Sequence, residues 1–263
     1  MTMTLVDMVP AAVQALSLSM ARALGCSLFL PFLGRRHMAA LHRNAICMAV
    51  SLPQAIAYWE MMVRVPDMAL NPMVLAFKEL LVGCLLGGLL AIPFWAFRGA
   101  FTLVDNQRGA NAAQMNNPAM EADSSLLGEW VERLLLTILI EAGALLWVFE
   151  ALAHSYQAWP LASLWLPLSE AVMGQVLTAY VNLMADTLML AAPYLLALLI
   201  IEFGMAIGSS AVQGIDIYQT AMPIKSLSAL ILLALSAGLY FQRGLERMES
   251  WWVDGVLRIM GFS

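Results

Sequence analysis

Residues 172–207 decide the fold, and they read VMGQVLTAYVNLMADTLMLAAPYLLALLIIEFGMAI. An apolar run of this length is more than enough to cross a lipid bilayer as a helix. As one straight helix the run would be about 54 Å long, whereas the hydrocarbon core of a bilayer is about 30 Å thick. We therefore expect the helix to break, and Pro193 is the expected position because proline interrupts the hydrogen bonding of a helix.

Five further apolar stretches accompany this one, and each is long enough to cross a bilayer. Hydrophobic residues make up 62% of the chain and charged residues only 12%, against roughly a quarter in an ordinary soluble domain. The sequence therefore predicts an all-α, polytopic helical membrane protein. The net charge of −5 and the absence of a Lys/Arg run argue against a nucleic-acid partner. The five stretches are residues 9–33, 44–63, 73–97, 134–152 and 221–241.

Some charged residues lie near the middle of an apolar stretch, where an ionised side chain that faces lipid costs roughly 2.5 to 3.5 kcal/mol. These are Arg22, Glu141 and Asp186. We expect them to face protein or water, either as a proton or ion relay or as polar contacts within the chain or between subunits. Lys78, Glu150 and Glu202 lie near the ends of their stretches, where a side chain can reach the interface, so no special role is expected for them.

Two GxxxG patterns occur in the apolar stretches, Gly83 with Gly87 and Gly204 with Gly208. Glycines at this spacing let two helix backbones approach closely in a membrane. Glu79 lies one turn before Gly83 on the same stripe. The patterns predict helix-packing faces without naming the helix that packs there.

The connection formed by residues 98–133 is the main polar insertion in the chain. It carries acidic, basic and amide side chains between two apolar stretches. Loops this long without evident structure are usually functional or disordered. The connection is therefore a candidate gate or binding element, and the alternative is a solvated connector.

Motifs of known catalytic sites do not occur: there is no HExxH, GxSxG, Walker A or GxGxxG pattern. The histidines are scattered and the cysteines lie in separate apolar stretches, so we expect no metal site and no cofactor. Glu141 and Glu150 fall on opposite faces of a straight helix, which argues against a catalytic carboxylate pair. Two alternatives stay open: a secondary transporter of a small solute that uses Asp186 near Pro193, and an intramembrane enzyme.

The string LVDNQRGA at residues 103–110 resembles the signature of the T subunit of type III secretion export apparatuses, the SctT/SpaR/YscT family related to flagellar FliR. Supporting strings are LPFL at 30–33, IPFW at 92–95 and AMPIKS at 221–226. The resemblance covers essentially the whole chain, residues 1–263, as one integral-membrane domain. Lys225 in the last string joins Arg22, Glu141 and Asp186 as a candidate for a buried charge contact.

The resemblance implies a non-enzymatic export-gate subunit of the bacterial inner membrane, lifted partly toward the periplasm. Its implied partners are the R and S subunits, the U switch subunit, membrane lipid and unfolded secreted proteins in transit. Residues 111–125 correspond to the family's plug loop, and the alternative is that the signature residues only brace the base of this loop. Asp105 and Arg108 can pair on one helical turn. The implied plug residues are Asp105, Asn106, Gln107, Arg108, Gly109, Asn111, Gln114, Met115, Asn116 and Asn117.

Overall fold

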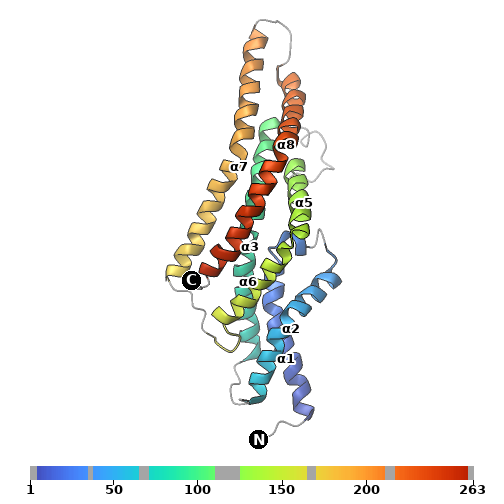
Figure 1. Ribbon diagram of the computed structural model, residues 1–263, viewed down its shortest axis with the longest axis vertical. Coiled ribbons are helices and arrows are strands. Elements are labelled where there is room, and N and C mark those ends of the chain that lie inside the picture. Colours follow the sequence, from blue (N-terminus) through green and yellow to red (C-terminus); the bar gives the residue numbers. More distant parts are fainter. Residues whose placement is uncertain are drawn as a thin grey trace. The chain divides into compact units, whose positions relative to one another are not determined.

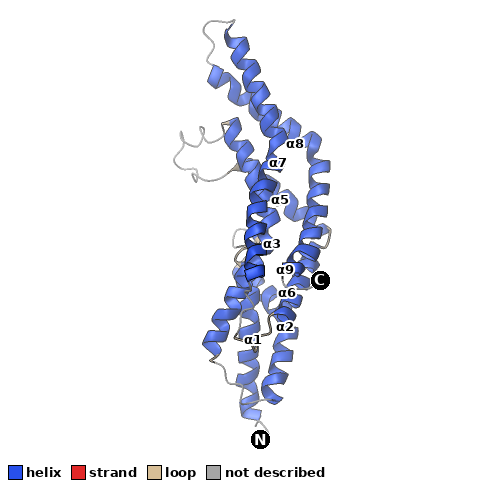
Figure 2. Cartoon of the chain, turned by 90° about the vertical axis from the view of Figure 1, so that its left-hand side faces the viewer, coloured by secondary structure: helices blue, strands red, loops and turns tan. Residues whose placement is uncertain are grey.

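The computed structural model describes residues 5–34, 38–64, 71–109, 125–164, 170–210 and 217–259, and within these ranges the chain is helical with no strand (Figure 2). Figure 1 shows the order of the helices along the chain. They are α1 (Leu5–Ser27), the 3-10 turn η1 (Pro31–Leu33), α2 (Ala40–Arg64), α3 (Pro72–Arg108), α5 (Leu126–Glu141), α6 (Ala144–Ala158), α7 (Glu170–Ser210), α8 (Ile217–Ser250), the π-helical turn η2 (Trp251–Gly255) and α9 (Val256–Ile259).

Five of the described helices are long and apolar enough to cross a membrane, or up to six spans if α5 and α6 together form one broken span. The prediction of an all-α, multi-pass membrane protein is confirmed. The candidate spans are Met8–Ser27, Ala40–Arg64, Pro72–Arg108, Glu170–Gly208 and Ala221–Ser250.

The predicted break at Pro193 is wrong, because α7 is continuous from Glu170 to Ser210 with Pro193 inside it. A proline removes one backbone donor and bends a helix, but neighbouring groups in a membrane bundle can compensate for the lost hydrogen bond. An apolar stretch longer than the hydrocarbon core is thick therefore did not require a break in the helix. A helix of this length can extend beyond the hydrocarbon core.

The helix break lies instead at Gly143, inside the stretch 134–152 that was expected to form one span. α5 ends at Glu141, α6 begins at Ala144, and Gly143 has a φ of 75°, in the left-handed region. Nothing lies within 4 Å of a Cβ built at Gly143, so the backbone angle rather than crowding requires the glycine.

The chain divides into two compact units. The first comprises Met1–Ile92, Gly143–Ala179 and Glu249–Ser263, and the second comprises Pro93–Ala142 and Tyr180–Met248. The boundaries fall inside α3 and α7 as well as between helices. The expectation of a single domain over residues 1–263 stays a prediction, and each unit is described by itself.

The first unit is built around close packing of α1 on the first part of α3. A Cβ built at Gly25 would lie 2.5 Å from the backbone oxygen of Leu80, and one built at Gly87 would lie 2.5 Å from that of Cys26. Such distances leave no room for a side chain, so the two backbones touch where the glycines lie. Trp252, completely enclosed, donates its indole N–H to the backbone oxygen of Leu90 at 2.9 Å.

In the second unit, α7 and α8 lie side by side and pack on the second part of α3 (Figure 1). A row of aromatic rings joins them: Phe101 of α3 meets Tyr194 of α7 edge to face at 5.2 Å, and Tyr194 meets Tyr240 of α8 at the same distance. Tyr240 also donates its hydroxyl to the backbone oxygen of Leu190 at 3.1 Å. The hydroxyls of Tyr194 and Ser236 lie 2.5 Å apart. These contacts set the register between the two helices.

Candidate functional site: the base of the polar loop

Asp105, near the end of α3, contacts both ends of the polar loop. Its Oδ2 accepts hydrogen bonds from the Ser125 hydroxyl at 2.6 Å and from the backbone N–H of Leu127 at 2.8 Å. Its Oδ1 accepts a hydrogen bond from Nε of Arg108 at 2.7 Å. The side chain of Asp105 is buried. We call Asp105, Arg108, Ser125 and Leu127 the loop base.

The sequence explains why the two helix ends meet at the loop base. Ser125 has extended backbone angles and caps α5, because its hydroxyl accepts a hydrogen bond from the N–H of Gly128 at 2.9 Å. The Asp105 carboxylate lies against the same helix N-terminus, where unpaired N–H groups and the helix dipole favour a negative charge. On the other side, Gly109 has a φ of 88° and ends α3. The end of α3 and the start of α5 therefore meet at the carboxylate of Asp105.

A second polar contact joins the end of α3 to α7 and α8. Lys225 of α8 donates to Glu202 Oε2 of α7 at 2.7 Å, and the Gln107 side-chain amide donates to the same oxygen at 3.3 Å. Lys225 is buried, as expected for a buried charge contact, whereas Glu202 is about half exposed. No role was expected for Glu202, and the structure makes it the shared acceptor. The sequence offered one signal for this contact: Glu202 lies near the end of an apolar stretch and has the opposite charge to Lys225.

The polar connection is shorter than residues 98–133, because α3 continues to Arg108 and α5 begins at Leu126. The predicted pairing of Asp105 with Arg108 on one helical turn is confirmed. Asn106 is exposed on the outer side of the same turn. The other predicted plug residues, Asn111, Gln114, Met115, Asn116 and Asn117, lie outside the described residues.

A buried charge network occupies the first unit. Arg22 of α1 and Glu79 of α3 are both 0% exposed, and Arg22 holds both carboxylate oxygens, through Nε at 2.7 Å and Nη2 at 3.0 Å. Arg22 also donates to the Ser155 hydroxyl at 3.1 Å and to the backbone oxygen of Trp159 at 2.7 Å. Its guanidinium lies 4.0 Å from the centre of the Tyr156 ring. The expectation that Arg22 faces protein is confirmed.

The interpretation of Lys78 as an interfacial side chain is wrong, because Lys78 is only 5% exposed and contacts Glu79 Oε1 at 2.6 Å. Its ammonium group also donates to the backbone oxygens of Pro160, Leu161 and Ser163 at 3.0, 3.3 and 2.9 Å. The backbone carbonyl oxygens that follow the end of α6 thus accept hydrogen bonds from two cationic side chains, Lys78 and Arg22. Distance from the end of an apolar stretch did not predict burial, since the turn after α6 covers this part of α3.

The other two mid-stretch charges differ from each other. Asp186 of α7 forms an ion pair with Arg247 of α8, with the aspartate side chain about one quarter exposed. The contact predicted for Glu141 stays a prediction: Glu141 is exposed at the last turn of α5, so its partner would have to come from another subunit. The break at Gly143 turns the expected middle of a span into a helix end.

The two GxxxG patterns also differ. Gly83 and Gly87 pack against the backbone of α1 at Arg22 and Cys26, so their partner belongs to the same chain. No described residue lies within 4 Å of a Cβ built at Gly204 or Gly208. A packing role for this second pair stays a prediction that needs a neighbour outside the chain.

Comparison with known proteins agrees with this architecture. A family model described as bacterial export proteins, family 1, matches residues 13–250. Yop proteins translocation protein T of Yersinia pestis is 34% identical over 87% of this chain and 88% of its own length. Surface presentation of antigens protein SpaR of Salmonella typhimurium is 29% identical over 85% of this chain and 82% of its own length. For flagellar biosynthetic protein FliR of Bacillus subtilis the identity is 21%, over 81% and 82%. The resemblance drawn from residues 103–110 is confirmed, and the chain belongs to family 1 of the bacterial export proteins.

Proposed function

We propose that this chain is a non-enzymatic subunit of a type III secretion export gate in the bacterial inner membrane, partly on its periplasmic side. It assembles with the R and S subunits, and contacts the U switch subunit, around a path for unfolded secreted proteins. The observation that carries the proposal is the loop base: one buried carboxylate in the DNQRG string holds both ends of a long polar loop. Relatives named for translocation and for a secretion apparatus support it.

The second unit supports the need for neighbours. Along α7 the exposed apolar side chains include Val181, Met184, Leu188, Ile200 and Phe203, each more than half exposed. In the apolar segment of the candidate span Glu170–Gly208, only 17% of the residues are buried within the chain. Such a surface requires a cover of lipid or of other subunits. A channel subunit that packs against several small membrane proteins would have such an exposed apolar surface and would cover it in the assembly.

The loop between Gly109 and Ser125 is the proposed plug of the resting pore. Asp105 forms hydrogen bonds with Ser125 and Leu127 at the start of α5, so both ends of the loop are tied to one buried carboxylate. Anchored ends restrict the positions that the loop can take, which is what an occluding element requires. In this arrangement Asp105 and Arg108 brace the loop, and the residues between 110 and 124 do the occluding.

The alternative of a small-solute transporter depended on a helix broken at Pro193 beside Asp186. α7 runs through Pro193 and Asp186 pairs with Arg247, so the two features on which that alternative depended do not form a broken-helix site.

The assembly is tested by purifying the tagged chain from its native host in mild detergent and identifying the retained proteins by mass spectrometry. We expect two other small helical membrane proteins in fixed ratio to this chain. A monodisperse chain that retains no other membrane protein would contradict the proposal and return the transporter alternative.

The plug is tested by deleting residues 112–122, which leaves the loop base intact. We expect the assembled pore to conduct ions at rest in planar bilayers, because the occluding segment is missing. A Gly/Ser replacement of the same length is the matched control, since it separates the length of the loop from its side chains. Asp105→Ala should also raise the resting conductance, because it releases both loop ends at once. A deletion variant as tightly closed as the wild type would rule out the plug.

A further inference from the structure

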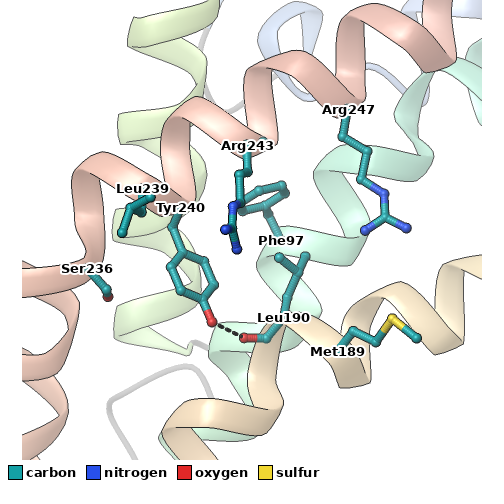
Figure 3. Close-up of a pocket in the computed structure, with 9 residues that line it drawn as sticks. Phe97, Met189, Leu190, Ser236, Leu239, Tyr240, Arg243 and Arg247 are labelled. Atoms are coloured by element: carbon teal, nitrogen blue, oxygen red, sulfur yellow. Dashed lines mark hydrogen bonds between the residues drawn. The ribbon is translucent and has the colours of Figure 1, made fainter.

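The second unit contains a cavity of about 280 Å³ between α7, α8 and the second part of α3 (Figure 3). This volume approaches the lower end of the range for small-molecule sites. Its floor is apolar and comes from three helices: Phe97 of α3, Met189 and Leu190 of α7, and Leu239 of α8. The floor offers no charge to a ligand, so it suits a hydrocarbon group.

The rim of the cavity is cationic. Arg243 and Arg247 lie one turn apart on α8, and Figure 3 shows both side chains extending from α8 toward α7. The other polar groups there have partners within the chain: the Tyr240 hydroxyl donates to Leu190, and the Ser236 hydroxyl donates to the backbone oxygen of Leu232 at 2.6 Å. Arg247 is paired with Asp186, so Arg243, whose guanidinium carries five N–H donors, is the rim group that a new anionic partner would meet first.

The charge at the rim limits the ligand. Arg247 pairs with Asp186, so the charge at the rim that a ligand would balance is that of Arg243. A single negative charge balances it, as on a phosphodiester. A guanidinium pair also matches the geometry of phosphate oxygens.

The position along α8 indicates where such a ligand comes from. Between Leu227 and Phe241 the helix carries no charged residue, and it then carries Gln242, Arg243, Glu246, Arg247 and Glu249. In a spanning helix this change marks the boundary between hydrocarbon and headgroups. Basic pockets between helices at this depth are suited to anionic headgroups.

We propose that this cavity binds one anionic phospholipid, with its phosphodiester against Arg243 and Arg247 and part of an acyl chain over Phe97, Met189 and Leu190. A water-soluble anion would use the rim and leave the apolar floor empty, and a neutral lipid would use the floor and offer Arg243 no anion. The inference depends on the membrane character of the chain and not on the proposed export function.

The test is native mass spectrometry of the full chain in mild detergent, titrated with phosphatidylglycerol, with phosphatidylcholine of the same acyl chains, and with inorganic phosphate. We expect one tightly bound phosphatidylglycerol, preferred over phosphatidylcholine by about fivefold or more. Equal binding of the two lipids overturns the proposal. Displacement of the phosphatidylglycerol by millimolar inorganic phosphate also overturns it, because the rim would then bind anions without the acyl chain.

Three variants separate this site from a general attraction to acidic lipid. Arg243→Gln should weaken phosphatidylglycerol binding about fivefold. Asp186→Asn should strengthen it by a similar factor, because it removes the carboxylate that competes for Arg247. Arg133→Gln is the matched control: this arginine of α5 lies in the same unit, is 67% exposed and does not line the cavity.

If Arg243→Gln and Arg133→Gln bind phosphatidylglycerol equally well, the assignment is wrong. It is also wrong if Asp186→Asn does not bind phosphatidylglycerol more tightly than the wild type.

The last measurement uses the assembled complex. Phosphatidylglycerol retained there at one per chain supports the lipid site. Its absence from the complex, with binding only to the isolated chain, would show that a neighbouring subunit fills the cavity and that the lipid assignment is wrong.

Discussion

Replacing Glu79 by glutamine should lower the free energy of unfolding by about 3 to 5 kcal/mol. Glu79 supplies the negative charge that two buried cations, Arg22 and Lys78, both contact. Arginine cannot lose its proton in a protein, so the variant would leave a guanidinium buried without its counter-ion. Glutamine keeps the shape of the side chain, so the expected loss reports the missing charge rather than a cavity.

The loss can be measured as thermal unfolding of the purified chain in detergent, where we expect the midpoint to fall by about 10 °C. The exposed pair of Glu60 and Arg64 on α2 provides the matched control, with side chains 55% and 78% exposed. Glu60→Gln should change the stability by less than about 0.5 kcal/mol. If Glu79→Gln were as stable as Glu60→Gln, the buried network would contribute nothing that a neutral amide could not replace.

A double variant separates the charge effect from the loss of packing. Arg22→Met combined with Glu79→Gln removes the guanidinium that Glu79→Gln leaves unpaired, so we expect it to recover about half of the lost stability. Lys78 stays in place and keeps its three backbone acceptors after α6. A double variant less stable than Glu79→Gln would mean that the contacts of Arg22 with Ser155 and Trp159 matter more than its charge.

The sequence was sufficient to predict the helical membrane class and the family. The apolar stretches were long, and the DNQRG string with its supporting strings spread over the chain. Arg22 was identified because an unpaired charge in the middle of a span is costly. Its partner was harder to identify, since Glu79 was noted only as part of the glycine stripe, and no spacing rule relates a residue in one helix to a residue in another.

The wrong predictions share a physical cause: position along an apolar stretch was used in place of position in the packed chain. Lys78 is near the end of its stretch, yet the turn after α6 encloses it. Glu141 is near the middle of its stretch, yet the left-handed Gly143 ends the helix there. α7 continues through Pro193, whereas the glycine with positive φ, Gly143, lies where α5 ends. Burial and breaks depend on tertiary contacts and on single backbone angles.

The same limit applies to Glu202 and Asp105. The resemblance left open whether Asp105 belongs to the plug or braces the base of its loop, and the carboxylate bonds to residues on both sides of the loop. Ser125 as a helix cap followed by Leu126 was a readable signal for the start of α5. The link from that cap back to Asp105 is a contact across the loop, and only the folded chain reveals it.

Gly83→Ala should destabilise the chain by about 1 to 3 kcal/mol, although alanine favours a helix over glycine by about 1 kcal/mol. A Cβ at Gly83 collides with the backbone carbonyl of Arg22, and backbone cannot move aside as a flexible side chain can. Gly83→Leu should prevent α1 from packing on α3 and should lower the amount of folded protein. The expected defect is thus in folding of the chain itself, since the partner of this GxxxG face is α1 and not another subunit.

Gly204→Ala provides the opposite sign in the same measurement. In the part of the chain that the structure describes, no atom lies within 4 Å of a Cβ at Gly204 in α7, so in the isolated chain alanine should stabilise by up to about 1 kcal/mol. Thermal unfolding of both variants in detergent decides the case, and a Gly83→Ala variant as stable as Gly204→Ala would refute the close packing of α1 on α3.

Gly204→Leu then tests the second glycine pair. If this variant leaves the isolated chain folded but abolishes copurification of other subunits, the open face of α7 is a packing face for a neighbour. Normal copurification would leave that face to lipid.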